Sequence, residues 1–180
     1  VPAGGLSVPI VTSSAIVGPA YEQGYAVAAL NCQGGQYDMV RAFLETAQEE
    51  KSPIILMAYE ANTEYYGLDW LPHLARELES RYTIPFAIHL DHGSEPEVVE
   101  EGIRAGYTSV MIDYSKRPLS QNIAASGRVA AAAAAAGVSV EAEIGELQRN
   151  TGDAPEEPKN LVDPRDVRDF LAAVDVDMLA

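Results

Sequence analysis

The stretch Pro85-Phe-Ala-Ile-His-Leu-Asp91 is a short apolar run that ends in polar residues. The other runs of this kind are Ala26–Asn31, Pro53–Tyr59, Ser109–Asp113, Ser139–Gly145 and Asp177–Ala180. In chain order, the starts of the six runs are 27, 32, 24, 30 and 38 residues apart. Continuous apolar runs are typical of parallel strands buried on both faces. The chain is therefore predicted to hold five parallel strands and the start of a sixth.

Helices are predicted between these strands. The predicted segments are Gln36–Lys51, Glu95–Ala105, Gln121–Ala136 and a last helix that opens at Asp163-Pro164. Gly106 and Gly137 follow two of them, as C-terminal glycines commonly do. Asp163 is suited to cap the last helix, and Pro164 to occupy its first turn. Strands that alternate with helices predict an α/β protein with a parallel sheet.

Two α/β folds fit this alternation, a doubly wound sheet and a (β/α)8 TIM barrel. No Gly-x-Gly-x-x-Gly follows the first run, which disfavours dinucleotide binding. Polar residues end one strand after another, as in barrel active sites. A barrel takes about 250 residues, and this chain has 180. We predict that residues 1–180 are a single domain that forms the N-terminal part of a (β/α)8 barrel. A complete five-stranded, flavodoxin-like domain is the alternative.

Composition narrows the classes of partner. The chain has 12 Lys and Arg against 27 Asp and Glu, a net charge of −15. Nucleic acid and anionic membranes are therefore not expected as partners, and an anionic substrate would need a cation. The single cysteine, Cys32, excludes an internal disulfide and suits a cytoplasmic location. The first residues lack the pattern of a signal peptide, and Ala130–Ala136 is too short to span a membrane.

Ionisable side chains are concentrated at the predicted strand ends. His89 and Asp91 share one face of their strand, and His92 lies at its tip. Asp113 ends the next strand, and the strand after it presents Glu141 and Glu143 opposite an apolar face. Neighbouring strands lie about 4.8 Å apart. We therefore expect two histidines and four carboxylates to meet in one buried layer.

Buried carboxylates are costly without a compensating cation. No lysine or arginine occurs in these strands, so a divalent metal is predicted, and imidazole with carboxylates suits zinc. The alternative is that each acid caps a helix or binds loop amides. His73 has no such neighbours and is interpreted as a surface or helix-capping histidine.

Several segments together resemble class II (zinc-dependent) fructose-bisphosphate aldolases and their tagatose-bisphosphate relatives. The most specific motifs are His89-Leu-Asp-His-Gly93 and Val140-Glu-Ala-Glu-Ile-Gly145, and the ordered resemblance runs from about Tyr25 to Ala180. The resemblance implies reversible cleavage of a ketose phosphate or bisphosphate, through a zinc-stabilised enediolate, to dihydroxyacetone phosphate and an aldehyde. It further implies a phosphorylated sugar substrate, a role in carbohydrate metabolism such as glycolysis, and a homodimer or homotetramer.

The resemblance also assigns roles to individual residues. Asp91 resembles the catalytic acid/base, and His92 a ligand of the catalytic zinc. Asp113 and Glu143 resemble the pair that holds a second metal position, and Asn31 a substrate-binding asparagine. Glu156 or Glu157 is a candidate for the acid of the family's lid.

Of three alternatives to this reading, the first is disfavoured and the other two stay open. A Schiff-base aldolase needs a buried nucleophilic lysine, whereas the only lysines are Lys51, Lys116 and Lys159, none of them in a suitable place. A metal-dependent hydrolase on the same fold could also use an Asp and a His at strand ends. A non-catalytic barrel binding protein is favoured by Tyr59 and Glu60, which stand where the family has a small hydroxyl residue near the substrate phosphate.

Overall fold

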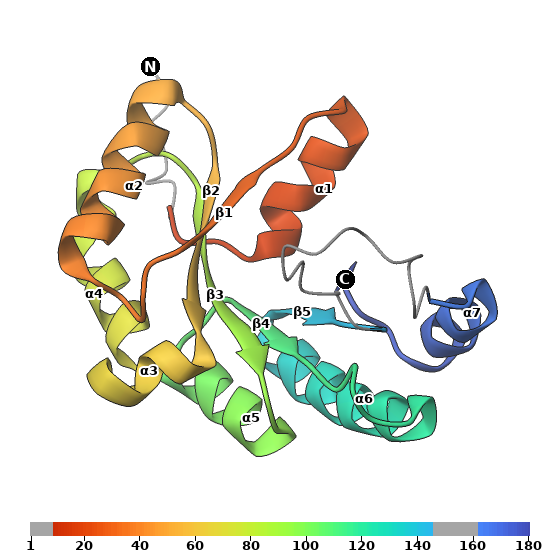
Figure 1. Cartoon of the computed structure of the whole chain (residues 1–180). Helices are drawn as coiled ribbons and strands as arrows, with labels where there is room; N and C mark the ends of the chain where they lie inside the picture. Colours follow the sequence, from red (N-terminus) through yellow and green to blue (C-terminus); the bar gives the residue numbers. More distant parts are fainter. Residues whose placement is uncertain (1–8, 146–161) are drawn as a thin grey trace, which may run out of the picture.

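The computed structural model describes residues 9–145 and 162–180. One parallel sheet organises them, and its strands pair in the order in which they occur along the chain. The strands are β1 Ala28–Asn31, β2 Ile54–Tyr59, β3 Phe86–Gly93, β4 Ser109–Ile112, β5 Ser139–Ala142 and β6 Met178–Leu179. Figure 1 shows that the sheet is strongly curled. The architecture is therefore an α/β half-barrel.

The strand order decides between the two folds considered from the sequence. A flavodoxin-like sheet has the order 2-1-3-4-5, whereas here each strand lies beside the next one in the chain. The flavodoxin-like alternative is therefore wrong. All six predicted strands are confirmed, although β5 ends at Ala142, so Ile144 and Glu143 already lie beyond the strand.

Helices cover the two faces of the sheet unequally. The helices are α1 Ser13–Gln23, α2 Tyr37–Glu50, α3 Glu60–Tyr66, α4 Trp70–Leu78, α5 Pro96–Ala105, α6 Leu119–Ala136 and α7 Pro164–Ala173. Helices α2, α4, α5 and α6 follow the convex side of the sheet, whereas α1 lies on the concave side (Figure 1). The concave face is thus the less covered of the two.

The four predicted helices are confirmed within two residues at each printed end. The caps are also as predicted: Asp163 accepts a hydrogen bond from the Arg165 amide at 2.8 Å, and Gly106 and Gly137 adopt positive φ angles at helix ends. Helices α1, α3 and α4 were not predicted. The signal for α4 was present, because Leu71, Leu74, Ala75 and Leu78 follow the helical period and are buried.

The main core lies between the convex face and its helices. Leu56 on β2, Leu90 on β3, Leu44 on α2 and Val99 on α5 are completely buried there. A smaller cluster on the concave face joins Ile16 of α1 to Ile55 and Ala87. Burial on both faces holds for β4, but Ala28, Ala29 and Leu30 of the edge strand β1 are exposed. In the part of the chain that the structure describes, no helix has the length and apolarity needed to cross a membrane.

Candidate metal and catalytic site

The register of the sheet arranges the concave face in rows. His89 of β3 lies level with Met57 of β2 and Ser109 of β4, which in turn is level with Ser139 of β5. Two residues further along, Asp91 is level with Tyr59, and Met111 with Glu141. Because side chains two apart on a strand share a face, each row points to the same side. Asp113 and Glu143 extend this face just past the ends of β4 and β5.

His92 departs from the strand alternation. Its φ angle of +52° lies in the left-handed region, and the pairing of β3 with β4 shifts register between Leu90 and Gly93. Regular alternation would place His92 on the face of Leu90, which points toward Gly102 of α5. A bulge of this kind re-aims a side chain. It brings the imidazole toward β4 and β5 instead.

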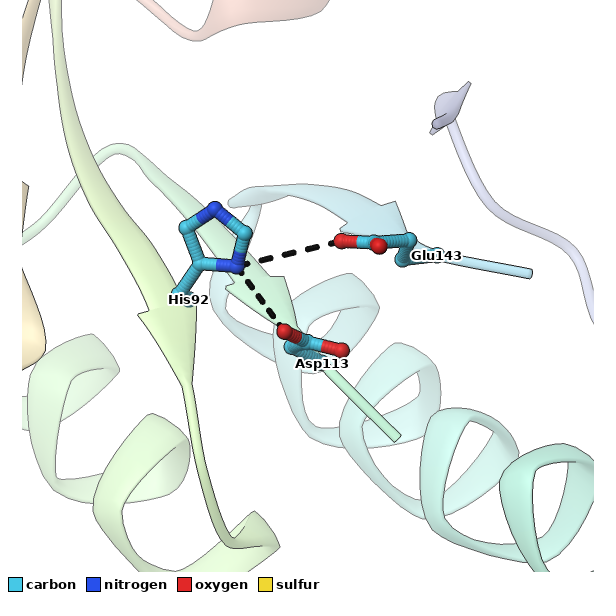
Figure 2. Close-up of side chains that lie close together, drawn as sticks. All are labelled: His92, Asp113 and Glu143. Atoms are coloured by element: carbon cyan, nitrogen blue, oxygen red, sulfur yellow. Dashed lines mark hydrogen bonds and ion pairs between the residues drawn. The ribbon is translucent and has the colours of Figure 1, made fainter. Parts of the chain in front are cut away.

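The re-aimed imidazole meets two carboxylates. His92 Nδ1 lies 2.9 Å from Asp113 Oδ2 and 3.8 Å from Glu143 Oε2 (Figure 2). One potential ligand atom from each of the three residues lies within 4.8 Å of the others. Figure 2 shows that the three side chains converge from the ends of β3, β4 and β5. The structure therefore brings together the three residues that the sequence proposed as metal ligands.

Asp113 is held in place by its own loop. Its Oδ1 accepts hydrogen bonds from the Ser115 hydroxyl at 2.6 Å and the Ser115 amide at 3.2 Å. Partial burial opposes ionisation, but the hydrogen bonds from Ser115 and His92 lower the pKa of Asp113 below its usual range. Partial burial likewise opposes the charged imidazole, but the bond to Asp113 and nearby carboxylates raise the pKa of His92. This arrangement favours an ionised Asp113 beside His92.

The other carboxylates of the cluster have raised pKa values. Burial and then the charge of Asp113 raise the pKa of Glu143, and burial with the charge of Asp91 raises that of Glu141. Burial, reinforced by Asp113 and opposed by His92, raises the pKa of Asp91. Mutual repulsion among carboxylates at one strand edge would be relieved by a cation.

His89 occupies a different environment from His92. Its side chain is 2% exposed, its Nδ1 lies 2.7 Å from Ser109 Oγ, and its Nε2 lies 3.6 Å from Glu141 Oε2. Burial, with a contribution from the charge of His92, lowers the pKa of His89 to about 4. The ring is therefore neutral, so the approach to Glu141 is not an ion pair at neutral pH.

The expectation of one buried layer is wrong. Only His89 is buried, whereas the side chains of Glu143, Asp113 and Glu141 are 14%, 22% and 25% exposed and that of His92 is 43% exposed. The reason is that these groups lie at or beyond the strand ends, on the open concave face. The cluster is therefore accessible to solvent and to a ligand.

Asn31 lies apart from this cluster. Its Oδ1 accepts a hydrogen bond from the Gln33 amide at 2.7 Å, and its amide nitrogen lies 3.5 Å from Asn62 Oδ1. It ends β1 two strands away from His89, at the same edge of the sheet. Its assignment as a substrate-binding residue stays a prediction. The candidate lid acids, Glu156 and Glu157, lie outside the described residues.

Two contacts of the site were missed by sequence reasoning. The Tyr59 ring meets the His92 ring edge-on, with 5.8 Å between centroids. Glu60 binds Ser94 through both carboxylate oxygens. Tyr59 and Glu60 had been noted only as departures at a phosphate site, and the sequence carried no signal that they contact β3 and the loop after it.

The donor set fits a divalent metal. One imidazole and two carboxylates are zinc ligands by type. Within residues 9–145 and 162–180, no lysine or arginine forms an ion pair with Asp91, Asp113, Glu141 or Glu143. Lys51 caps the far end of α2 and Lys116 is an exposed loop residue, so neither is a buried Schiff-base nucleophile. Lys159 lies outside the described residues.

A curled parallel sheet with an imidazole–carboxylate cluster at its carboxyl ends defines an α/β protein whose site is placed as in barrel enzymes. Residues 11–180 match the family model described as fructose-bisphosphate aldolase class-II. The chain belongs to this family, whose members are generally zinc-dependent.

Named relatives agree with this assignment. The chain is 37% identical over 175 residues to a fructose-bisphosphate aldolase of Staphylococcus aureus strain Mu50, covering 96% of this chain and 60% of the relative. It is 36% identical over 174 residues to a fructose-bisphosphate aldolase of Helicobacter pylori strain 26695, covering 95% and 56%. The chain thus spans about three fifths of the length of these relatives.

A solved structure supports the fold. The crystal structure of the YdjI aldolase from Escherichia coli K12 superposes with a TM-score of 0.80, covering 94% of this chain and 63% of that one, at 23% identity. At this identity the likeness concerns the fold alone.

Proposed function

We propose that the protein is a metal-dependent aldolase that reversibly cleaves a ketose phosphate or bisphosphate to dihydroxyacetone phosphate and an aldehyde. The observation that carries the proposal is the convergence of His92, Asp113 and Glu143 in a chain of the class II aldolase family. In the same proposal, residues 1–180 are one domain, the N-terminal part of a (β/α)8 barrel. The described half-barrel supports this through its sequential strand order.

His92, Asp113 and Glu143 are the residues that would hold the metal, with His92 as a ligand of a catalytic zinc and the two carboxylates as the place of a second divalent ion. The Nδ1 of His92 faces Asp113, and its other ring nitrogen points away from both carboxylates (Figure 2). This orientation suits metal binding through Nε2, because ligating imidazoles commonly bond a carboxylate through their other nitrogen. When bound, the cation supplies Lewis-acid stabilisation of the enediolate charge.

Asp91 is the group proposed to move the proton. In the cleavage direction it removes the proton of the C4 hydroxyl as the C3–C4 bond breaks, and it returns the proton in condensation. Its raised pKa, caused first by burial, brings it nearer to neutral pH, where a base of this kind works best. Asn31, at the same edge of the sheet, is proposed to bind the substrate. A homodimer or homotetramer and a cytoplasmic location stay predictions.

The test is an aldol-cleavage assay of the full-length protein with several ketose phosphates, fructose 1,6-bisphosphate among them, with and without a chelator. The chelator is expected to abolish cleavage and zinc to restore it. His92→Ala is expected to lose bound metal and activity. His73→Ala, which removes an exposed imidazole on α4, is the matched control and should keep both. Full metal content in His92→Ala would overturn the ligand assignment.

A further inference from the structure

The carboxylate of Glu60 joins two neighbouring strand ends. Glu60 is the first residue of α3, directly after β2. Its Oε2 accepts a hydrogen bond from the Ser94 backbone amide, and its Oε1 accepts one from the Ser94 hydroxyl at 2.8 Å. Ser94 lies two residues beyond His92, at the start of the loop that leads from β3 into α5. Both acceptor oxygens of Glu60 are thus used on one residue next to the site.

This contact lies where the pairing between β2 and β3 has already ended. The β2–β3 ladder ends at the pair Tyr59 and Asp91, so His92, Gly93 and Ser94 have no partner strand on the β2 side. On the β4 side the segment is fixed, because the Asp113 amide donates to the Gly93 carbonyl at 2.9 Å and a Cβ at Gly93 would lie 2.6 Å from the Met111 carbonyl oxygen. Glu60 supplies the restraint on the side where the sheet supplies none.

The segment needs such a restraint because of the conformation of His92. A side chain other than glycine in the left-handed region is strained, and it persists only where its surroundings determine it. With His92 43% exposed, little packing holds its ring beyond the edge of Tyr59. Besides its bond to Asp113, the direction of the ring therefore depends on the backbone turn, which β4 holds at Gly93 and Glu60 holds at Ser94.

We propose that Glu60 is a positioning residue: by holding Ser94 it fixes the left-handed turn at His92 and so directs the imidazole toward Asp113 and Glu143. The metal-binding consequence rests on the proposed function, whereas the effect on the His92 ring does not. Glu60 acts through hydrogen bonds in this scheme. A glutamine can keep both of them, because its carbonyl accepts from the Ser94 amide and its NH2 donates to the Ser94 hydroxyl oxygen.

The experiment compares Glu60→Ala, Glu60→Gln and Glu64→Ala in the full-length protein. Glu64 lies on the same helix and is exposed, so its variant removes an equal charge without touching Ser94. The first measurement is the side-chain 1H–15N spectrum of His92 in metal-free protein, assigned with His92→Ala. Glu60→Ala is expected to lose the signature of the Nδ1 hydrogen bond to Asp113, and the other two variants are expected to keep it.

The second measurement is a titration with Co2+ alone. Glu60→Ala is expected to bind Co2+ about 10-fold more weakly, the lower end of what loss of a direct hydrogen-bond partner of a metal ligand costs, because Glu60 acts on His92 through Ser94. Glu60→Gln and Glu64→Ala should bind it nearly as well as the wild type. If the wild type binds no Co2+ through His92 while Glu60→Ala still alters the His92 spectrum, the proposed function fails and the positioning role stands.

The positioning role would be overturned by an unchanged His92 spectrum in Glu60→Ala. It would equally be overturned if Glu60→Gln or Glu64→Ala were as impaired as Glu60→Ala, because charge and not the bond to Ser94 would then be responsible. Should Glu60→Ala fail to fold, Glu60→Asp replaces it, since its carboxylate is one methylene short of Ser94, and the same outcomes apply.

Discussion

The middle and the carboxyl end of β3 place the same residue type in opposite environments. At its middle, His89 is 2% exposed and neutral, in a strand that pairs regularly with β2. At its carboxyl end, His92 is 43% exposed, adopts a positive φ angle and has a raised pKa beside Asp113. The two histidines are only three positions apart in the chain. The difference shows that one bulge, and not residue type, decides which histidine faces Asp113 and Glu143 and is open to a ligand.

The regular part of β3, around His89, and its irregular carboxyl end, around His92, contribute differently to the protein. His89 is completely enclosed, and its bond to Ser109 satisfies one ring nitrogen inside the sheet. The irregular end instead costs backbone strain, of order 1 kcal/mol or more for a residue in a sparsely populated region. Such strain is commonly found at functional sites. The comparison therefore assigns stability to the first part and chemistry to the second.

The largest expected effect tests whether the chemistry lies at the irregular end. Asp91 is the boundary residue, the last of β3 that pairs with β2. In Asp91→Asn the fold and the metal content should be retained, while aldol cleavage should fall by about 10²- to 10⁴-fold, because a general acid/base contributes on that scale. The measurement is steady-state cleavage of a ketose phosphate by metal-replete protein.

Metal analysis of the same preparation is the control for this prediction. Near-normal turnover in an Asp91→Asn protein with full metal content would move the proton-transfer role away from β3. The comparison between the middle and the carboxyl end of β3 would then describe metal binding alone.

A smaller expected effect concerns the regular part of β3 and is seen in how the free energy of unfolding depends on pH. Burial lowers the pKa of His89 to about 4, below the 6.5 of an unperturbed histidine. The unfolded chain therefore binds the proton first, so the stability that His89 contributes is complete above pH 6.5 and is lost as the pH falls toward 4. A shift of this size corresponds to roughly 3 kcal/mol. Glu141 and His92 are the titrating groups nearest to this ring or electrostatically coupled to it.

The measurement is urea unfolding of metal-free protein at several pH values, for the wild type and His89→Gln. The raised pKa values of Asp91, Glu141 and Glu143 act in the opposite direction, because those groups bind protons more readily in the folded state. The difference between the two proteins isolates His89. If the wild type and His89→Gln showed the same pH dependence of stability between pH 4 and 6.5, His89 would not be a buried neutral histidine.

The sequence predicted the regular part well. Apolar runs and helix caps follow local rules, so the six strands, their parallel order and the caps at Gly106, Gly137 and Asp163 could be found without coordinates. Polar residues at successive strand ends also predicted that two histidines and four carboxylates would gather at one edge of the sheet. The family resemblance then selected His92, Asp113 and Glu143, which do meet.

The irregular part was beyond the same rules. Alternation placed His92 only at the tip of its strand, and nothing local indicated a bulge, because the bulge depends on how Gly93 packs against Val99 and the Met111 carbonyl. The expected burial of the carboxylates was also wrong, since exposure depends on where each strand ends relative to its neighbours. The contact between Glu60 and Ser94 joins residues 34 positions apart, a separation at which sequence pattern carries no signal.

The smallest expected effect tests the comparison most directly, because its sign should reverse between the two histidines. At position 89, in regular strand conformation, glycine should be less stable than alanine by about 0.5–1 kcal/mol, owing to its greater backbone freedom in the unfolded chain. At position 92, where φ is +52°, alanine is strained by roughly 1–2 kcal/mol and glycine is not. Glycine should therefore be the more stable replacement there.

At each position the alanine and glycine variants both lack the imidazole, so the lost contacts of the ring largely cancel in the difference between them. The free energies of unfolding of His89→Ala, His89→Gly, His92→Ala and His92→Gly in urea, without metal, give the two differences. If glycine proved less stable than alanine at both positions, His92 would be an ordinary strand residue in solution, and the contrast between the middle and the carboxyl end of β3 would be lost.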